Sequence, residues 1–240
     1  MRRFRIVALS SGVALAASIA VAIAGTPFGG DDSGTIPSDG PKGPTTKCEN
    51  GVGKAVGKLT GAIGKCHASR ASGKLADDSA EETCESAAFT KFNATKILLC
   101  DGCTNLSTTD ALVESITDTN TDFVYCTATG TPFGGDGQGN IPSDAPNGPI
   151  TKCANGVNKA AGKLVAALLR CHASRASGKL ADDVAEDTCE SAALTTFGAT
   201  KTAGCDPCTN LAILAVLIEN DVDGGNSIIY CASPSGAFLQ

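Results

Sequence analysis

The sequence predicts an all-α protein made of tandem duplicated small domains. Each domain is expected to be a disulfide-stapled antiparallel helical hairpin plus a short third helix and a Gly/Pro-rich N-terminal loop. Two observations support this fold class. The segment that begins Gly-Thr-Pro-Phe-Gly-Gly-Asp at Gly25 recurs at Gly130, and the cysteines repeat at the same offset of 105 residues without a gap. Apolar residues also recur at the helical spacing of three and four positions through much of each repeat.

Residues 1–24 are typical of a secretory signal peptide. Arginines stand at positions 2, 3 and 5, an apolar stretch follows, and Ala22-Ile23-Ala24 supplies a small-x-small cleavage pattern. The alternative is a retained membrane anchor, because the apolar run approaches the length that spans a bilayer. We favour cleavage before Gly25, and we therefore expect a secreted or periplasmic protein.

The repeat defines two expected domains, residues 25–126 and 130–231, with a linker at 127–129. Each domain opens with Gly, Pro, Asp and Ser, which is the composition of a loop. A long helix is expected over residues 46–72, because Thr46 and Glu49 form a capping box and Gly73 follows as a stop signal. Five glycines lie inside this helix and the second repeat keeps two of them, so the first copy is expected to be the less stable.

Two further helices are expected in each repeat. One begins after Asp78, with Glu81 in its first turn, and in the second repeat it is expected to end at Gly204. A shorter helix is expected over residues 106–116. Short extended segments at 123–126 and 228–231 close the two units.

The cysteine spacing predicts how the two long helices are joined. An antiparallel hairpin would bring Cys66 next to Cys84 at one end. At the other end, Cys48 would meet one cysteine of the Cys-x-x-Cys pair that begins at Cys100, and the other would bond Cys126. An exported chain with an even cysteine count favours disulfides throughout. The expected disulfide cysteines are Cys48, Cys66, Cys84, Cys100, Cys103, Cys126, Cys153, Cys171, Cys189, Cys205, Cys208 and Cys231.

Several short motifs, taken together, resemble a group of bacterial secreted proteins. They are the Thr-Pro-Phe-Gly-Gly-Asp opening, the Lys65-Cys66-His67 step, the Cys84-Glu85 step, the Cys-x-x-Cys pair and the closing Tyr-Cys. That group carries tandem six-cysteine repeats, and the resemblance covers residues 25–231. The resemblance implies a bacterial exported protein and implies no particular activity.

Charge narrows the range of partners. Loss of residues 1–24 removes three of the 19 basic residues and none of the 25 acidic ones, which leaves 16 against 25. This balance argues against nucleic acid and against anionic membrane surfaces. No second long apolar segment follows, so we expect no membrane span after cleavage. The expected partner is an unknown protein or a polysaccharide, and a homo-oligomer is a further option.

The sequence contains no coherent catalytic set, so we predict that the protein is not an enzyme and uses no cofactor. The Cys-x-x-Cys pairs lack the following histidine of a c-type haem site, and an exported chain favours disulfides over a redox pair or zinc. His67 and His172 each follow a cysteine and are expected to be helix residues beside a disulfide. No metal site is therefore expected. The alternative is a metal- or haem-handling protein that uses these Cys-His steps.

The duplicated disulfide-rich unit and the absence of a catalytic set favour an exported, non-catalytic interaction or structural protein as the function. In the third helix of the second repeat, Ile213 and Leu214 stand where the first repeat has threonines, and Leu217 extends the apolar row. We expect Ile213, Leu214 and Leu217 to form an interface with the other repeat or with a second chain. The alternative is that this helix lies deeper in the core of its own repeat. Basic residues also recur along one side of the first helix of each repeat. Such a stripe is more often a solvated face paired with acidic residues, and the alternative is a binding surface for an acidic polysaccharide.

Overall fold

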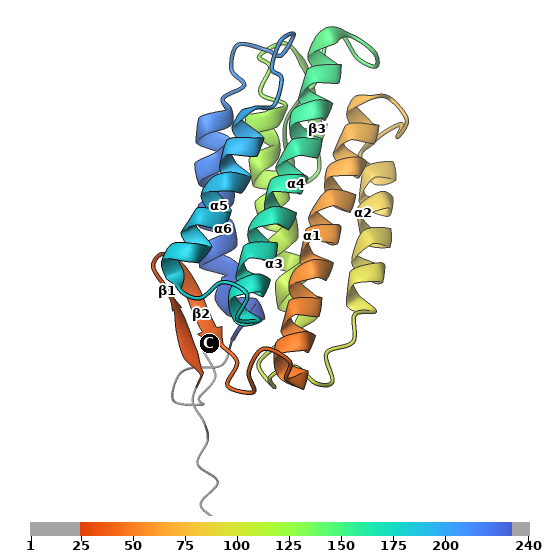
Figure 1. Cartoon of the computed structure of the whole chain (residues 1–240). Helices are drawn as coiled ribbons and strands as arrows, with labels where there is room; N and C mark the ends of the chain where they lie inside the picture. The colour runs from red at the N-terminus through yellow and green to blue at the C-terminus, as the bar shows by residue number, and fades with distance from the viewer. Residues whose placement is uncertain (1–24, 232–240) are drawn as a thin grey trace, which may run out of the picture.

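The computed structural model describes residues 25–231, so the expected signal peptide lies outside the described part. This part is mainly helical, and its helices run alongside one another in a single bundle (Figure 1). The helices are α1 (Pro44–Ala71), α2 (Asp78–Asn93), α3 (Leu106–Val124), α4 (Pro149–Ala176), α5 (Asp183–Gly198) and α6 (Leu211–Ile229). The strands are β1 (Thr26–Gly29), β2 (Asp32–Ile36), β3 (Gly130–Gly134) and β4 (Gly137–Pro142).

The Gly/Pro-rich segments form two small antiparallel sheets, which corrects the expectation of N-terminal loops in an all-α protein. Thr26 pairs with Ile36 in the β1–β2 hairpin, and β3 pairs with β4 in the same way. Gly29 and Gly30 form the first turn with φ of 100° and 57°, a backbone region that favours glycine. Because glycine and proline dominate these segments, their composition resembles that of a loop although the chain forms hairpins.

The first helix of each repeat begins differently from the prediction. α1 starts at Pro44, and the carboxylate of Asp39 accepts hydrogen bonds from the backbone N–H groups of its first turn. Asp144 caps α4 in the same way. The predicted capping box at Thr46 and Glu49 is therefore wrong. Glu49 is fully buried, and its burial, reinforced by the nearby Asp101 carboxylate, raises its pKa to about 9.

The other helix ends also differ. α5 ends at Gly198 rather than at Gly204, so the segment up to Cys205 is a loop. α3 continues to Val124, well past the expected end at residue 116, and α6 continues to Ile229. The third helix of each repeat is consequently long, and it replaces the extended segments expected at 123–126 and 228–231.

The two longest helices, α1 and α4, pack against each other at the centre of the bundle. Gly57 lies against Ala166 and Gly61 lies against Gly162, so the two helices run antiparallel. A Cβ atom on Gly57 would come within 3.1 Å of the Cα of Ala166. Glycines that weaken an isolated helix therefore permit close contact between these two helices.

The two halves of the chain exchange their hairpins. The β1–β2 hairpin packs on α6, and the β3–β4 hairpin packs on α3. The backbone N–H of Thr35 donates to the carbonyl of Tyr230 at 3.0 Å, and Asn140 donates to Tyr125 at 2.9 Å. Both apolar core clusters draw residues from both halves. Each half therefore completes its core with a segment of the other half.

The disulfides follow the same reciprocal pattern. The predicted bonds Cys66–Cys84 and Cys171–Cys189 are present, and Cys48 bonds Cys100, one of its two expected partners. Cys126 was expected to bond a cysteine of its own repeat, and this prediction is wrong. Cys153 bonds Cys205, the equivalent of the Cys48–Cys100 bond, whereas Cys103 bonds Cys231 and Cys126 bonds Cys208. Two of the six bonds therefore link one half to the other.

Candidate metal centres

A buried histidine in the second half of the chain faces three carboxylates. Nε2 of His172, in α4, lies 2.8 Å from Asp32 Oδ1, 3.0 Å from Glu190 Oε1 and 3.4 Å from Asp223 Oδ1. The carboxylates come from β2, α5 and α6, and the ring of His172 is fully buried. Glu186, one turn before Glu190, belongs to the same group. We call these five residues the His172 centre.

Local sequence and packing explain why these side chains meet. Glu186 and Glu190 are four residues apart, so both project from one face of α5. The Cys171–Cys189 disulfide holds that face against α4 directly beside the histidine. Asp32 reaches the centre only because the β1–β2 hairpin of the first half packs on α6.

The polar atoms of the His172 centre are not satisfied by one another. An imidazole nitrogen carries at most one hydrogen, whereas three oxygens surround Nε2 of His172. None of the three contacts is aligned as a hydrogen bond. Within the described residues, both ring nitrogens and the facing oxygens of Asp32, Glu190 and Asp223 have no hydrogen-bond partner. Such a group needs a shared positive charge.

The first half contains a related group around His67. Nε2 of His67 lies 3.0 Å from Glu85 Oε1, 3.3 Å from Asp118 Oδ1 and 4.0 Å from Glu81 Oε1. All four side chains are buried and project from α1, α2 and α3. We call these residues the His67 centre. Phe133 of the exchanged β3–β4 hairpin packs edge-on against the ring at 6.0 Å, which shields the centre on that side.

The other ring nitrogen of His67 determines which way its lone pair points. The hydroxyl of Thr121 donates to the carbonyl of Thr117 at 2.8 Å, so its oxygen can accept from Nδ1 of His67 at 3.1 Å. The neutral ring then carries its proton on Nδ1. The lone pair of Nε2 faces Glu85 and Asp118, the orientation that a metal-binding histidine adopts when a hydrogen bond holds its other nitrogen.

One substitution distinguishes the two centres. Asp32 supplies a carboxylate to the His172 centre, but Gly137 stands at the corresponding position of the other hairpin. An arginine one turn beyond each histidine adds positive charge: Arg70 Nε lies 3.9 Å from Glu81, and Arg175 Nε lies 3.7 Å from Glu186. The His172 centre therefore holds four carboxylates against the three of the His67 centre.

Protons compete with a metal ion for both centres. Burial lowers the pKa of His67, but the facing carboxylates of Asp118 and Glu85 outweigh burial and raise it to about 9. The pKa of His172 is likewise raised well above its usual value by Asp223, Asp32 and Glu190, although burial opposes the shift. Burial also raises the pKa of Glu186 to about 8. Without a metal ion, protons must therefore supply the missing positive charge.

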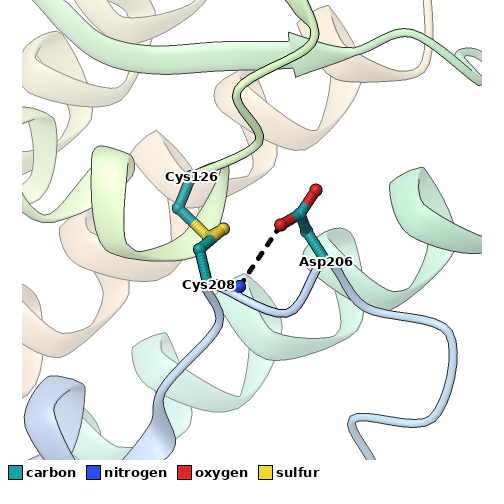
Figure 2. A group of neighbouring side chains, drawn as sticks. All are labelled: Cys126, Asp206 and Cys208. Carbon is teal, nitrogen blue, oxygen red and sulfur yellow. Dashed lines mark hydrogen bonds between the residues drawn. A yellow bond between two sulfur atoms is a disulfide. The ribbon is translucent and has the colours of Figure 1, made fainter.

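The Cys-x-x-Cys segments are not part of a metal site. Figure 2 shows Cys126 and Cys208 joined by a disulfide, with Asp206 turned toward the backbone N–H of Cys208, which donates to Asp206 Oδ1 at 3.2 Å. The two cysteines of each motif bond different partners, so neither motif forms a redox pair of its own. Sulfur atoms in disulfides offer no thiolate to a metal.

The residues expected at an interface have different environments. Leu214 is buried in a core cluster that includes Val124 and Tyr125 of the first half. Leu217 is partly buried, and Ile213 is 49% exposed. The row of apolar residues thus divides between the core and the surface. The basic residues that recur along one side of α1 and α4 are exposed: Lys47, Lys54, Lys58, Lys65, Lys152, Lys159, Lys163 and Arg170. Among the described helices, none combines the length and apolarity that a membrane crossing requires.

The carboxylates of both centres were not among the site residues predicted from the sequence. A signal was present, because each repeat carries His, then Arg three residues on, then two glutamates four residues apart. Two glutamates four residues apart lie on one face of a helix, and the predicted disulfide next to each histidine would hold that face against it. Asp118 and Asp223 gave no such signal, because the helix that carries them was predicted to end before them.

Comparison with known proteins does not assign the chain to a family. Nothing matches it among family models, curated proteins or solved structures. The interpretation of the two centres accordingly rests on their own geometry and chemistry.

Proposed function

We propose that this chain is an exported, non-catalytic, disulfide-locked protein that binds divalent transition-metal cations in its two buried histidine–carboxylate centres. The observation that carries the proposal is the set of three carboxylate oxygens around Nε2 of His172, none of them in a hydrogen bond with the ring. The sequence left a metal-handling protein as an alternative, and we adopt it here in a changed form. Carboxylates, rather than cysteines, join the histidines as metal ligands.

The spacing of the donor atoms suits a single cation. Ligand atoms bound to one ion at about 2.0–2.2 Å are separated from each other by roughly 2.8–3.6 Å in tetrahedral or octahedral arrangements. The distances from Nε2 of His172 to its three oxygens, 2.8 to 3.4 Å, fall in this range. A small shift of the side chains would bring all four atoms onto one ion.

The donor set favours a particular class of metal. One imidazole with several carboxylates suits Mn²⁺, Fe²⁺ or Zn²⁺, whereas soft ions such as Cu⁺ prefer sulfur ligands. All cysteines are in disulfides, so the described chain offers no thiolate. Ca²⁺ and Mg²⁺ favour sites made of oxygen alone, and the central imidazole argues against them.

Export of the protein is part of the same proposal. The signal-like segment at 1–24, the six disulfides and the resemblance to bacterial secreted proteins all support a secreted or periplasmic location. We also infer that the chain arose by duplication of a six-cysteine unit. The contacts between the halves are reciprocal, as between the subunits of a twofold dimer: Asn50 donates to Ser177, and Asn155 donates to Ser72.

Calorimetry on the mature, oxidised chain tests the proposal. After dialysis against a chelator, the protein is titrated with ZnCl₂ and with MnCl₂, and its thermal unfolding is followed with and without each ion. We expect saturable binding, and at 100 times the Kd an added stability of about 2.7 kcal/mol. His67→Gln and His172→Gln should each remove part of the binding.

A matched control separates the centres from other acidic groups. Asp206→Asn removes a carboxylate that lies beside the Cys126–Cys208 disulfide and outside both centres, so it should leave binding unchanged. If neither ion binds with a Kd below about 1 mM and unfolding does not respond to the chelator, the proposal is wrong.

A further inference from the structure

The exposed side of α1 and α4 carries only positive charge. Apart from the proline at its start and one glycine, each helix exposes four residues, and all eight are basic. The two helices contain one acidic residue, Glu49, and it is buried. We call the eight residues the basic face: Lys47, Lys54, Lys58, Lys65, Lys152, Lys159, Lys163 and Arg170.

The packing of the two helices joins these residues into one surface. α1 and α4 run side by side through the middle of the bundle (Figure 1), and α3 and α6 pack on them from the core side. The exposed residues of both helices therefore lie together on the opposite side, in two rows along the seam between the helices. From Lys47 to Lys65, each such row extends about 27 Å at 1.5 Å per residue.

Like charges meet across this seam. Nδ2 of Asn158 donates to the carbonyl of Gly64 at 2.7 Å. The next residues of the two helices, Lys65 and Lys159, therefore stand within about 3 Å of the same level along the helix axes. Within residues 25–231, no carboxylate forms an ion pair with any residue of the basic face. The face is thus not the acid-paired surface that a stripe of lysines usually forms, and a bound anion would relieve the repulsion across the seam.

The charge of the rest of the chain limits the shape of the anion. The basic face takes eight of the 16 basic residues outside residues 1–24, which leaves eight against 25 acidic residues elsewhere. A broad anionic surface, such as a lipid membrane, would also come within about 8–10 Å of that acidic surface, where charge repulsion is incompletely screened. A single chain lying along the seam would contact the basic face alone.

The composition of α1 and α4 argues against nucleic acid and against membranes. Neither helix contains an aromatic residue on which a base could stack. The large apolar side chains that are exposed in the described chain lie outside both helices, so the face has no group to insert into a bilayer. Seven of its eight residues are lysines, which act as point charges and impose no particular geometry on the anion.

We propose that the basic face binds an acidic polysaccharide, which lies along the seam between α1 and α4 with its anionic groups against the two rows of basic residues. Charge complementarity without aromatic or apolar anchors selects the polysaccharide from the partners that the sequence left open. No residue of either histidine centre takes part, so this inference is independent of the proposed function.

Binding of two anionic polysaccharides to the oxidised mature chain tests the inference. Polygalacturonate carries carboxylates, dextran sulfate carries sulfates, and dextran is the neutral control. Calorimetry is performed at low salt with a chelator present, so that metal ions do not contribute. We expect at least one of the two polyanions to bind, dextran not to bind, and the affinity to fall as salt is added. The tighter polyanion identifies the anionic group that the face prefers.

A variant of the middle of the face locates the binding. It combines Lys54→Gln, Lys58→Gln, Lys159→Gln and Lys163→Gln. It should bind about 10-fold or more weakly, because four exposed ion pairs to the polysaccharide are lost. The matched control removes the same number of charges from exposed lysines outside α1 and α4, and should change the affinity by less than about threefold. Its changes are Lys74→Gln, Lys96→Gln, Lys179→Gln and Lys201→Gln.

Circular dichroism confirms that both variants keep the helical fold. Absence of binding by both polyanions would overturn the inference, and so would an unchanged affinity in the first variant or an equal loss in the control. Tighter binding of single-stranded DNA or of phosphatidylglycerol vesicles than of either polysaccharide would also overturn it, because the partner would then be a nucleic acid or a membrane.

Discussion

Exchange of one residue between the hairpins tests whether the carboxylate number sets the affinity of each centre. Asp32→Gly would give the His172 centre the composition of the His67 centre, and Gly137→Asp would do the reverse. The structure accommodates the second change. A Cβ atom on Gly137 would lie 3.4 Å from the Cβ of Phe133, which is ordinary van der Waals contact, and its φ is not positive.

The expected magnitude follows from the role of the ligand. Loss of a side chain that only supports a metal ligand lowers affinity by about 10–100-fold. Asp32 lies 2.8 Å from Nε2 of His172 and would bind the ion directly, so its loss should cost at least about 100-fold, or roughly 2.8 kcal/mol. Gly137→Asp should strengthen binding at the His67 centre by about 10-fold or more.

Calorimetry with Zn²⁺ measures the Kd of each variant. Asp32→Gly is made in a chain that carries His67→Gln, and Gly137→Asp in a chain that carries His172→Gln, so that only the altered centre binds the ion. Circular dichroism confirms that each variant keeps the helical fold. The reasoning is refuted if Asp32→Gly leaves the Kd within about threefold of the unmodified value in a folded protein. It is equally refuted if Gly137→Asp weakens binding at the His67 centre.

Three predictions concern the fold, and urea unfolding of the oxidised protein measures each. Gly57→Ala should destabilise the protein because its Cβ would press on α4, whereas Gly51→Ala meets open space and should stabilise it by up to about 1 kcal/mol. Leu214→Thr should cost about 2 kcal/mol or more and Ile213→Thr less than about 0.5 kcal/mol, because only the first is buried; equal effects would contradict this placement. Asp144→Ala should cost about 1 kcal/mol at neutral pH through loss of the cap of α4. Burial raises the pKa of Asp144, but the hydrogen bonds from the first turn of α4 outweigh burial and lower the pKa below 3.8. The loss of stability caused by Asp144→Ala should therefore persist above pH 3.8. It should vanish as the pH falls through the lowered pKa, because the carboxylate of the unmodified chain is then protonated.

The parts of the fold that follow from local rules were predictable. Helical periodicity and the glycine at position 73 located α1 and its end, and the spacing of Cys66 and Cys84 gave their disulfide. The partners of Cys103 and Cys126 were not predictable in this way. In a repeated sequence the same spacing fits a bond within one copy and a bond to the equivalent cysteine of the other copy.

The residues of the two centres could be predicted from the sequence only in part, for a related reason. Helical spacing together with the predicted Cys66–Cys84 bond could have placed Glu81 and Glu85 beside His67. Asp32 could not, because it stands 140 residues before His172, in a segment whose composition resembles a loop. Only the exchange of hairpins between the halves brings Asp32 to the histidine.

The bonds between the halves also set the order in which the chain can be oxidised. In a chain whose cysteines become available from the N-terminus onward, Cys103 and Cys126 precede Cys208 and Cys231. Immediate oxidation would join the first two to each other, and thiol–disulfide exchange would then be needed to reach the native pairing. The first half alone has no native partner for either cysteine, so the native pairing of both requires the second half of the chain.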